Sequence, residues 1–425
     1  MTSQFLITYD LEAEVLLLNN QPINKYEHKT CSGDFLIFRV TSNGLELEVP
    51  FFLLDNIFYY QLNHLLYFGK HLTDFSKLTF PDLEANKLLN NQEFLPHART
   101  QLVGVNILCS YLQYTFSKRG LTIEPCYPSS ELQDARTVED LMDCFRVVFR
   151  KQVEKVNSEH FILPLSGGMD SRLLLDLALD IKGVELRLFT LGTERSGDVK
   201  VARRIATSLG LEKNHTVFNL EDINKNDLLD NYRACDYLLP LDRLLNTPLG
   251  NYFQKSAVLS GLYGDVIFAD NTVGSQSYES YIAGEGIVAH SDDDRQIINA
   301  YNKLPKLPKL QRTLLRCQKL TRQSFPLSPG FEFITPFVDP EVITVASSVK
   351  DSGLYSSLVA KYMRPALKEI IHQSTMSYFT HPHWLRVVER KIFKLFKHPA
   401  RLPYFDVRYL DSIDVKPNEA PLINN

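Results

Sequence analysis

The chain has 425 residues, enough for two or three domains, and its 44% hydrophobic and 23% charged residues are typical of a folded globular protein. The formal net charge of −4 argues against a general attraction to nucleic acid, and no apolar run reaches the roughly 18 residues that a membrane span needs. The first residues lack the features of a secretory signal and the six cysteines form no Cys-x-x-Cys pair, so we expect a cytoplasmic protein with reduced thiols.

Residues 1–128 are predicted to form an antiparallel, β-rich domain. Three pairs of short apolar or alternating segments are separated by turn-forming residues: 35–40 with 45–49, 57–60 with 65–68, and 111–116 with 121–124. This spacing is typical of strands joined by short turns.

From about residue 129 the pattern changes to alternating helices and strands. Thr137 is expected to cap a helix that carries Glu139 and Asp140 in its first turn. The elements expected after it are a strand at 161–165, a helix at 172–181, a strand at 186–191, a helix at 199–209 and a strand at 215–218. Such alternation predicts an α/β domain over 129–400, a parallel sheet with helices on both faces, followed by a tail at 401–425.

The strand at 161–165 runs directly into Ser166-Gly167-Gly168-Met169-Asp170-Ser171. Glycines without a Cβ let backbone N–H groups approach an anion, and the helix that follows points its positive end at the same place. The two serines add hydroxyl donors, so we expect an anion site at the carboxyl edge of the sheet. The loop lacks the Gly-Lys-Ser/Thr ending of a Walker A motif.

Asp170 is the unusual member of this loop, because phosphates repel a carboxylate. A Mg²⁺ ion between the carboxylate and the phosphates removes that repulsion. Residues 257–265, Ala-Val-Leu-Ser-Gly-Leu-Tyr-Gly-Asp, repeat the arrangement, with an apolar strand that ends in Ser260-Gly261 and with Asp265 in the turn beyond. The two loops together predict a magnesium–phosphate site held by Asp170 and Asp265.

These motifs resemble the asparagine synthetase family, whose synthetase domain is an ATP pyrophosphatase with an adenine nucleotide α-hydrolase-like fold. Besides the two loops, three motifs carry the resemblance in the same order: Thr190-Leu-Gly-Thr193 followed by Asp198, Glu332-Phe-Ile-Thr-Pro-Phe-Val-Asp339, and Lys361-Tyr-Met-Arg364. The resemblance runs from about residue 137 to 370.

The resemblance implies that the chain binds ATP and Mg²⁺. Carried over residue by residue, it implies that pyrophosphate and nucleotide are contacted by Leu165, Ser166, Gly167, Gly168, Ser171, Leu191, Ser260 and Gly261. Asp170 and Asp265 would hold Mg²⁺. Lys361 would stabilise the charge that develops when a carboxylate attacks the α-phosphorus, whereas Arg364 is expected to be structural.

Two departures from the family pattern matter for function. Leu262 occupies the place of the Glu that usually follows Ser-Gly in the second loop and serves the amine nucleophile, and an apolar side chain accepts no proton. The chain starts Met1-Thr2-Ser3, where family members often begin Met-Cys-Gly with the cysteine as glutaminase nucleophile. We therefore expect residues 1–128 to be a degenerate glutaminase-like (Ntn-type) domain; a role for Thr2 as nucleophile is the less favoured hypothesis.

The function that these features predict is an AMP- and pyrophosphate-forming amide ligase. It would adenylate an aspartate-like carboxylate, as in asparagine synthesis, and transfer it to ammonia or an amine without its own glutamine hydrolysis. Two alternatives remain: an intramolecular amide former similar to β-lactam synthetases or lasso peptide macrolactam cyclases, and a non-catalytic ATP-binding protein. A tRNA-modifying enzyme is disfavoured by the charge and by the absence of Cys-x-x-Cys. The expected partners are thus a small carboxylate or a peptide, and no nucleic acid.

Overall fold

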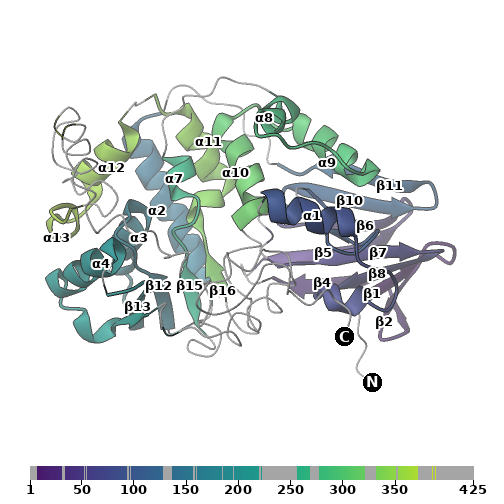
Figure 1. Cartoon of the computed structure of the whole chain (residues 1–425), viewed down its shortest axis with the longest axis horizontal. Helices are drawn as coiled ribbons and strands as arrows, with labels where there is room; N and C mark the ends of the chain where they lie inside the picture. The colour runs from purple at the N-terminus through teal and green to yellow at the C-terminus, as the bar shows by residue number, and fades with distance from the viewer. Residues whose placement is uncertain are drawn as a thin grey trace.

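The computed structural model describes residues 7–371 apart from gaps, and beyond them only Leu385 and Val388. The gaps are 31–33, 52, 54, 93–94, 96, 128–135, 157, 159, 184, 195, 220–221, 223–255, 269–276, 321–331 and 351–352. An antiparallel β region and a parallel sheet with helices lie side by side along the longest axis of the molecule (Figure 1). The predicted tail at 401–425 lies outside the described residues.

The β region contains two antiparallel sheets. One has the strand order β3-β2-β1-β8-β7-β9 and the other β11-β10-β6-β5-β4. The elements are β1 (Ile7–Asp10), β2 (Val15–Leu18), β3 (Gln21–Ile23), β4 (Lys25–Lys29), β5 (Phe35–Thr41), β6 (Gly44–Glu48), β7 (Phe58–Leu62), β8 (Leu65–Gly69), η1 (Leu72–Phe75), α1 (Leu83–Gln92), β9 (Asn106–Ile107), β10 (Leu112–Ser117) and β11 (Gly120–Pro125). The three predicted strand pairs are confirmed as β5–β6, β7–β8 and β10–β11.

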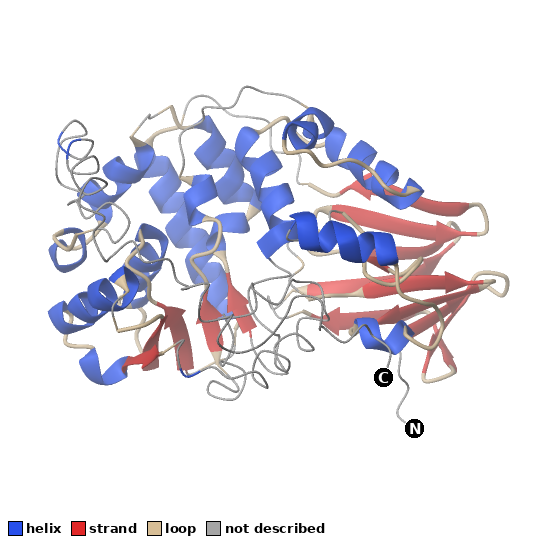
Figure 2. Ribbon diagram, viewed as in Figure 1, coloured by secondary structure: helices blue, strands red, loops and turns tan. Residues whose placement is uncertain are grey.

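Aromatic side chains hold the two sheets face to face. The ring centroids of Phe38 on β5 and Phe68 on β8 are 5.0 Å apart, and those of Tyr59 on β7 and Phe116 on β10 are 5.3 Å apart. All four side chains are buried, and both pairs meet edge-on, the arrangement that the ring quadrupole favours. This core fixes the β region as a sandwich (Figure 2).

The second half is built on a parallel sheet of order β14-β13-β12-β15-β16, which confirms the predicted α/β class. Its strands are β12 (His160–Pro164), β13 (Glu185–Leu191), β14 (His215–Phe218), β15 (Ala257–Leu259) and β16 (Glu332–Ile334). The chain begins this sheet at its centre, adds β13 and β14 on one side, and then crosses to add β15 and β16 on the other. The loops after β12 and β15 therefore leave neighbouring strands at the same edge, at the point where ligands bind in such sheets.

The described helices of this half are α2 (Val138–Lys155), α3 (Met169–Ala178), α4 (Gly197–Ser208), η2 (Glu212–Asn214), α7 (Gly264–Ile267), α8 (Tyr278–Gly284), α9 (Asp292–Asn302), α10 (Pro308–Leu320), η5 (Pro336–Val338), α11 (Pro340–Ser348), α12 (Leu354–Tyr362) and α13 (Pro365–Lys368). They cover the sheet, except that α9 packs on β11 of the antiparallel region and α8 packs on α9 and α10. α3 packs on β12, α4 on β13 and β14, and α2 on β16. None of the helices in the described part of the chain is long and apolar enough to cross a bilayer.

The first residues of α2 and α3 can be compared with the helix starts predicted from the sequence. Thr137 caps α2 as expected: its hydroxyl accepts the N–H of Asp140 and the Asp140 carboxylate accepts the N–H of Thr137, a reciprocal capping box. The helix predicted to start at Arg172 instead starts at Met169, with Gly168 as its N-cap. The earlier start places Asp170 and Ser171 in the first helical turn.

The β region and the α/β region are joined around β16 and α11. The hydroxyl of Tyr111 donates to the carbonyl of Val338 at 2.6 Å, and the hydroxyl of Tyr127 donates to the carbonyl of Pro340 at 3.0 Å. The ammonium of Lys29 lies 2.5 Å from the carboxylate of Glu332. These contacts fix the second antiparallel sheet against the edge of the parallel sheet.

Candidate active site

The two glycine-containing loops predicted from the sequence touch each other. A Cβ added to Gly261 would lie 3.2 Å from the Cβ of Asp170, and one added to Gly264 would lie 2.3 Å from Oδ1 of Asp170. Only a residue without a Cβ permits the second approach. Ser260 is held at the same edge, because its N–H donates to the carbonyl of Ile334 on β16 at 2.9 Å.

Asp170 and Asp265 form a pair of like charges. Burial raises the pKa of the Asp170 carboxyl well above its usual value, and the charge of Asp265 raises it further, against a smaller lowering by the Asp265 backbone N–H. The Oδ1 atom of Asp170 is buried and makes no hydrogen bond. A buried carboxylate oxygen without a donor, beside a second carboxylate, fits a divalent cation, so these residues suit Mg²⁺.

The backbone N–H groups of the first loop are already engaged within the protein. Ser166 donates to the hydroxyl of Ser171 at 3.3 Å, Gly167 donates to Oδ1 of Asp198 at 2.9 Å, and Gly168 donates to the hydroxyl of Ser166 at 3.1 Å. The sequence pattern predicts these residues as contacts of pyrophosphate and assigns no role to Asp198. A phosphate that takes the Gly167 N–H must displace the Asp198 carboxylate.

Arg172 anchors the first loop, a role that the sequence pattern does not predict. Its guanidinium donates to the carbonyls of Gly167, Leu367, Ile370 and Ile371 at 2.7 to 3.0 Å. The side chain is fully buried, and burial lowers the pKa of Arg172 to about 10. An arginine at the head of the apolar run Leu173-Leu174-Leu175 was the available signal, because such a residue needs acceptors inside the fold.

The nucleotide-side residues Leu165 and Leu191 lie at the ends of β12 and β13. The hydroxyl of Thr190 donates to the carbonyl of Leu165 at 2.6 Å and lies 2.8 Å from Nε2 of His215. Burial, with a smaller effect of Arg203, lowers the pKa of His215. A neutral His215 that carries its proton on Nε2 can donate to Thr190, which in turn orients the Leu165 carbonyl.

The described contacts of Lys361 do not place it at the two loops that carry Asp170 and Asp265. Its ammonium pairs with the carboxylate of Glu139 at the start of α2 and lies 5.4 Å from the ring centroid of Tyr362, and both partners of the ion pair are more than half exposed. Its catalytic role stays a prediction. Arg364 pairs with the carboxylates of Asp176 and Asp180 and so ties α13 to α3.

Leu262 lies inside the second loop. Its N–H donates to the hydroxyl of Ser260 at 3.3 Å, and its half-buried side chain packs against the core. This position in the loop therefore offers no acid or base.

The comparison with known proteins agrees with this geometry. The family model described as Asparagine synthase matches residues 148–282. This segment is an asparagine synthase-type domain. The segment contains the strands β12, β13, β14 and β15 and the two loops that carry Asp170 and Asp265, which we call the carboxylate loops. The match supports the function of an ATP-dependent amide ligase of the asparagine synthetase family. No curated protein gives a significant match to the chain.

The match also separates the candidate residues into two groups. All of the predicted loop and strand residues, from Leu165 to Asp265, lie within the asparagine synthase-type domain. The motif at 332–339 and the predicted catalytic Lys361 lie beyond it. In the structure the first of these motifs forms β16, η5 and the start of α11, where the Asp339 carboxylate caps the helix by accepting the N–H of Glu341 at 2.9 Å.

Proposed function

We propose that this protein is an AMP-forming amide ligase that lacks glutamine hydrolysis of its own. It activates an aspartate-like carboxylate with MgATP to an acyl-adenylate, releases pyrophosphate, and transfers the acyl group to ammonia or an amine. The observation that carries this proposal is the contact between Asp170 and the turn that leads to Asp265, at the switch point between β12 and β15.

Each residue of the site has a distinct role in the proposal. Asp170 and Asp265 hold the cation, and Mg²⁺, when bound, neutralises phosphate charge and polarises the phosphorus. The hydroxyls of Ser166 and Ser171, which lie 3.1 Å apart and now bond within the loop, would turn to donate to the pyrophosphate together with the first turn of α3. Lys361 is our candidate for the residue that stabilises the charge on the α-phosphate. In this role its ammonium must leave the carboxylate of Glu139 and bind the phosphate instead.

Leu262 bears on the second half of the reaction. Without a carboxylate at this position, residue 262 does not attract or deprotonate a free amine. This favours, as a second candidate, an intramolecular amide former, in which the amine and the activated carboxylate belong to one substrate and are held together by binding.

The domain division is part of the same proposal. We assign residues 1–128 to a degenerate glutaminase-like domain, 129–400 to the synthetase domain and 401–425 to a tail. The contacts of Tyr111 with the end of η5 and of Tyr127 with the start of α11 support a fixed arrangement of the first two domains.

The test is exchange of labelled pyrophosphate into ATP, measured against a panel of carboxylates. Adenylation is reversible, so the correct acid gives exchange before any amine is added. The Asp170→Asn variant should lose exchange by at least about a hundredfold and unfold at the same or a higher urea concentration, because it removes one of two close like charges. Asp143→Asn on the exposed face of α2 is the matched control and should keep wild-type exchange.

Three outcomes contradict the proposal in different ways. Release of ADP and orthophosphate in place of AMP rejects adenylation. Exchange that persists in Asp170→Asn rejects the assigned cation ligand. Normal ATP binding without exchange for any acid favours the non-catalytic binding protein.

A further inference from the structure

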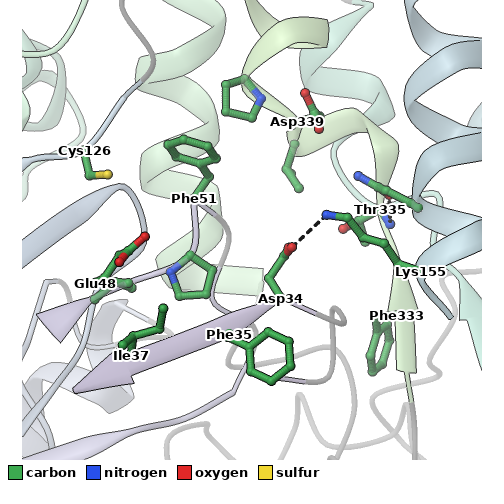
Figure 3. A pocket seen from close by; sticks show the side chains of 15 residues that line it. Asp34, Phe35, Ile37, Glu48, Phe51, Cys126, Lys155, Phe333, Thr335 and Asp339 are labelled. Atoms are coloured by element: carbon green, nitrogen blue, oxygen red, sulfur yellow. Dashed lines mark hydrogen bonds and ion pairs between the residues drawn. The ribbon is translucent and has the colours of Figure 1, made fainter. Parts of the chain in front are cut away.

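A cavity of about 450 Å³ lies where the second antiparallel sheet meets the α/β region (Figure 3). One wall comes from β5, β6 and the residues that follow β6. The opposite wall comes from the end of α2, from β16 and from the turn into α11. The volume is within the range of pockets that bind small molecules.

Two phenylalanine rings line this cavity without being buried by the protein. Phe35 at the start of β5 is 47% exposed and Phe51 is 39% exposed, and Phe333 on β16 lies on the opposite wall. Exposed rings gathered around one hollow leave apolar area that a ligand can cover. The apolar part of a ligand therefore has a defined place.

The charged groups that line the cavity are three carboxylates and one ammonium. Asp34 and Lys155 satisfy each other across it at 2.7 Å, as the dashed line in Figure 3 shows. Glu48 and Asp339 remain. Glu48 lies 3.9 Å from the guanidinium of Arg39, and Asp339 accepts the N–H of Glu341 with one carboxylate oxygen and feels the charges of Lys155 and Lys151. The cavity thus has an excess of negative charge.

We propose that this cavity binds a small organic ammonium ion with an apolar body. The ammonium lies toward the carboxylates of Asp339 and Glu48, and the apolar body covers the rings of Phe35 and Phe51. Burial raises the pKa of Asp339, so its carboxylate is poorly hydrated and gains from a bound cation. An organic anion of the same shape is repelled by the excess negative charge of the cavity. This site is separate from the two carboxylate loops, and it does not rest on the proposed ligase activity.

The first experiment is calorimetric titration of the full-length protein with four probes. 2-Phenylethylammonium is expected to bind in the micromolar to millimolar range, and 2-phenylethanol, 3-phenylpropionate and ammonium chloride at least about tenfold more weakly. The alcohol removes the charge, the carboxylate reverses it and the inorganic salt removes the apolar body. Equal binding of the alcohol, or no binding of the phenylethylammonium at millimolar concentrations, overturns the proposal.

Two variants then locate the bound ion. Asp339→Asn keeps the cap of α11, since Asn caps helices as well as Asp, and should weaken binding about tenfold. Phe51→Ala should weaken it several-fold. The matched controls are Asp292→Asn, on the exposed first turn of α9, and Phe80→Ala, a ring that is 67% exposed outside the cavity. Equal losses in variants and controls place the ligand elsewhere and refute the assignment.

Discussion

Replacement of Gly264 by alanine tests the contact between the two loops directly. The new Cβ would lie 2.3 Å from Cγ and Oδ1 of Asp170 and 2.8 Å from its Cβ, where ordinary contacts start at 3.4 Å. Relief needs a displacement of about 1 Å (3.4 minus 2.3), and the short distance to Cβ means that rotating the carboxylate alone does not suffice. Misplacement of a catalytic group by about 1 Å costs about a hundredfold in rate, or about 2.7 kcal/mol.

The stability effect has two opposing parts. An alanine normally stabilises a helix by about 0.5 to 1 kcal/mol relative to glycine, but the overlap costs about 1 to 3 kcal/mol. We expect a net loss of about 1 kcal/mol in urea unfolding, which should shrink when Asp170 is also replaced by alanine, since the carboxylate is then absent.

Two other glycines provide a graded control for pyrophosphate exchange. A Cβ at Gly261 meets its nearest atoms at 3.2 Å, so Gly261→Ala should lose only a few-fold in exchange rate. A Cβ at Gly284 on α8 has no heavy atom within 4 Å, so Gly284→Ala should leave exchange unchanged. Wild-type exchange and stability in Gly264→Ala would refute the assigned contact.

The remaining predictions concern residues around the loops. Arg172→Met leaves four carbonyls without their donor and should destabilise the protein by more than about 3 kcal/mol in urea unfolding; a change below 1 kcal/mol contradicts the anchor. Lys361→Ala should change stability by less than about 0.5 kcal/mol but abolish exchange, while Glu139→Gln keeps exchange; equal rates in both variants remove Lys361 from the mechanism. Because burial lowers the pKa of His215, the unfolded chain binds its proton more readily below about pH 6.5. The free energy of unfolding of the wild type minus that of His215→Gln should therefore decrease from pH 7 to pH 5. A difference that stays constant over this range contradicts the prediction.

The sequence predicted those elements whose burial follows a regular pattern. β12 appears as an apolar run because Phe161, Ile162 and Leu163 are all buried, as the central strand of a parallel sheet requires. β3, with Gln21 and Pro22 exposed, has too few buried residues to produce a pattern and was missed. The sequence pattern does not predict the helices α8 and α10 either.

The site was predictable to the extent that it is local. Both loops are continuous in sequence, so spacing alone brought out Asp170 and Asp265. The acceptor of the Gly167 N–H lies 31 residues away in Asp198, and two of the carbonyls that Arg172 binds lie 195 and 198 residues away. Such partners depend on how distant segments pack, which the spacing of neighbouring residues does not encode.

Asp198 already occupies a place that an incoming phosphate would use. Its carboxylate accepts the Gly167 N–H and so holds the glycine loop in shape without a bound phosphate. If a nucleotide phosphate takes this N–H, its affinity would reflect the free energy of the phosphate–amide hydrogen bond minus that of the Asp198–amide hydrogen bond it replaces. Under the proposed function, the loop would therefore bind phosphate less tightly but would be ordered before binding. The Asp198 carboxylate would return to the Gly167 N–H when pyrophosphate leaves.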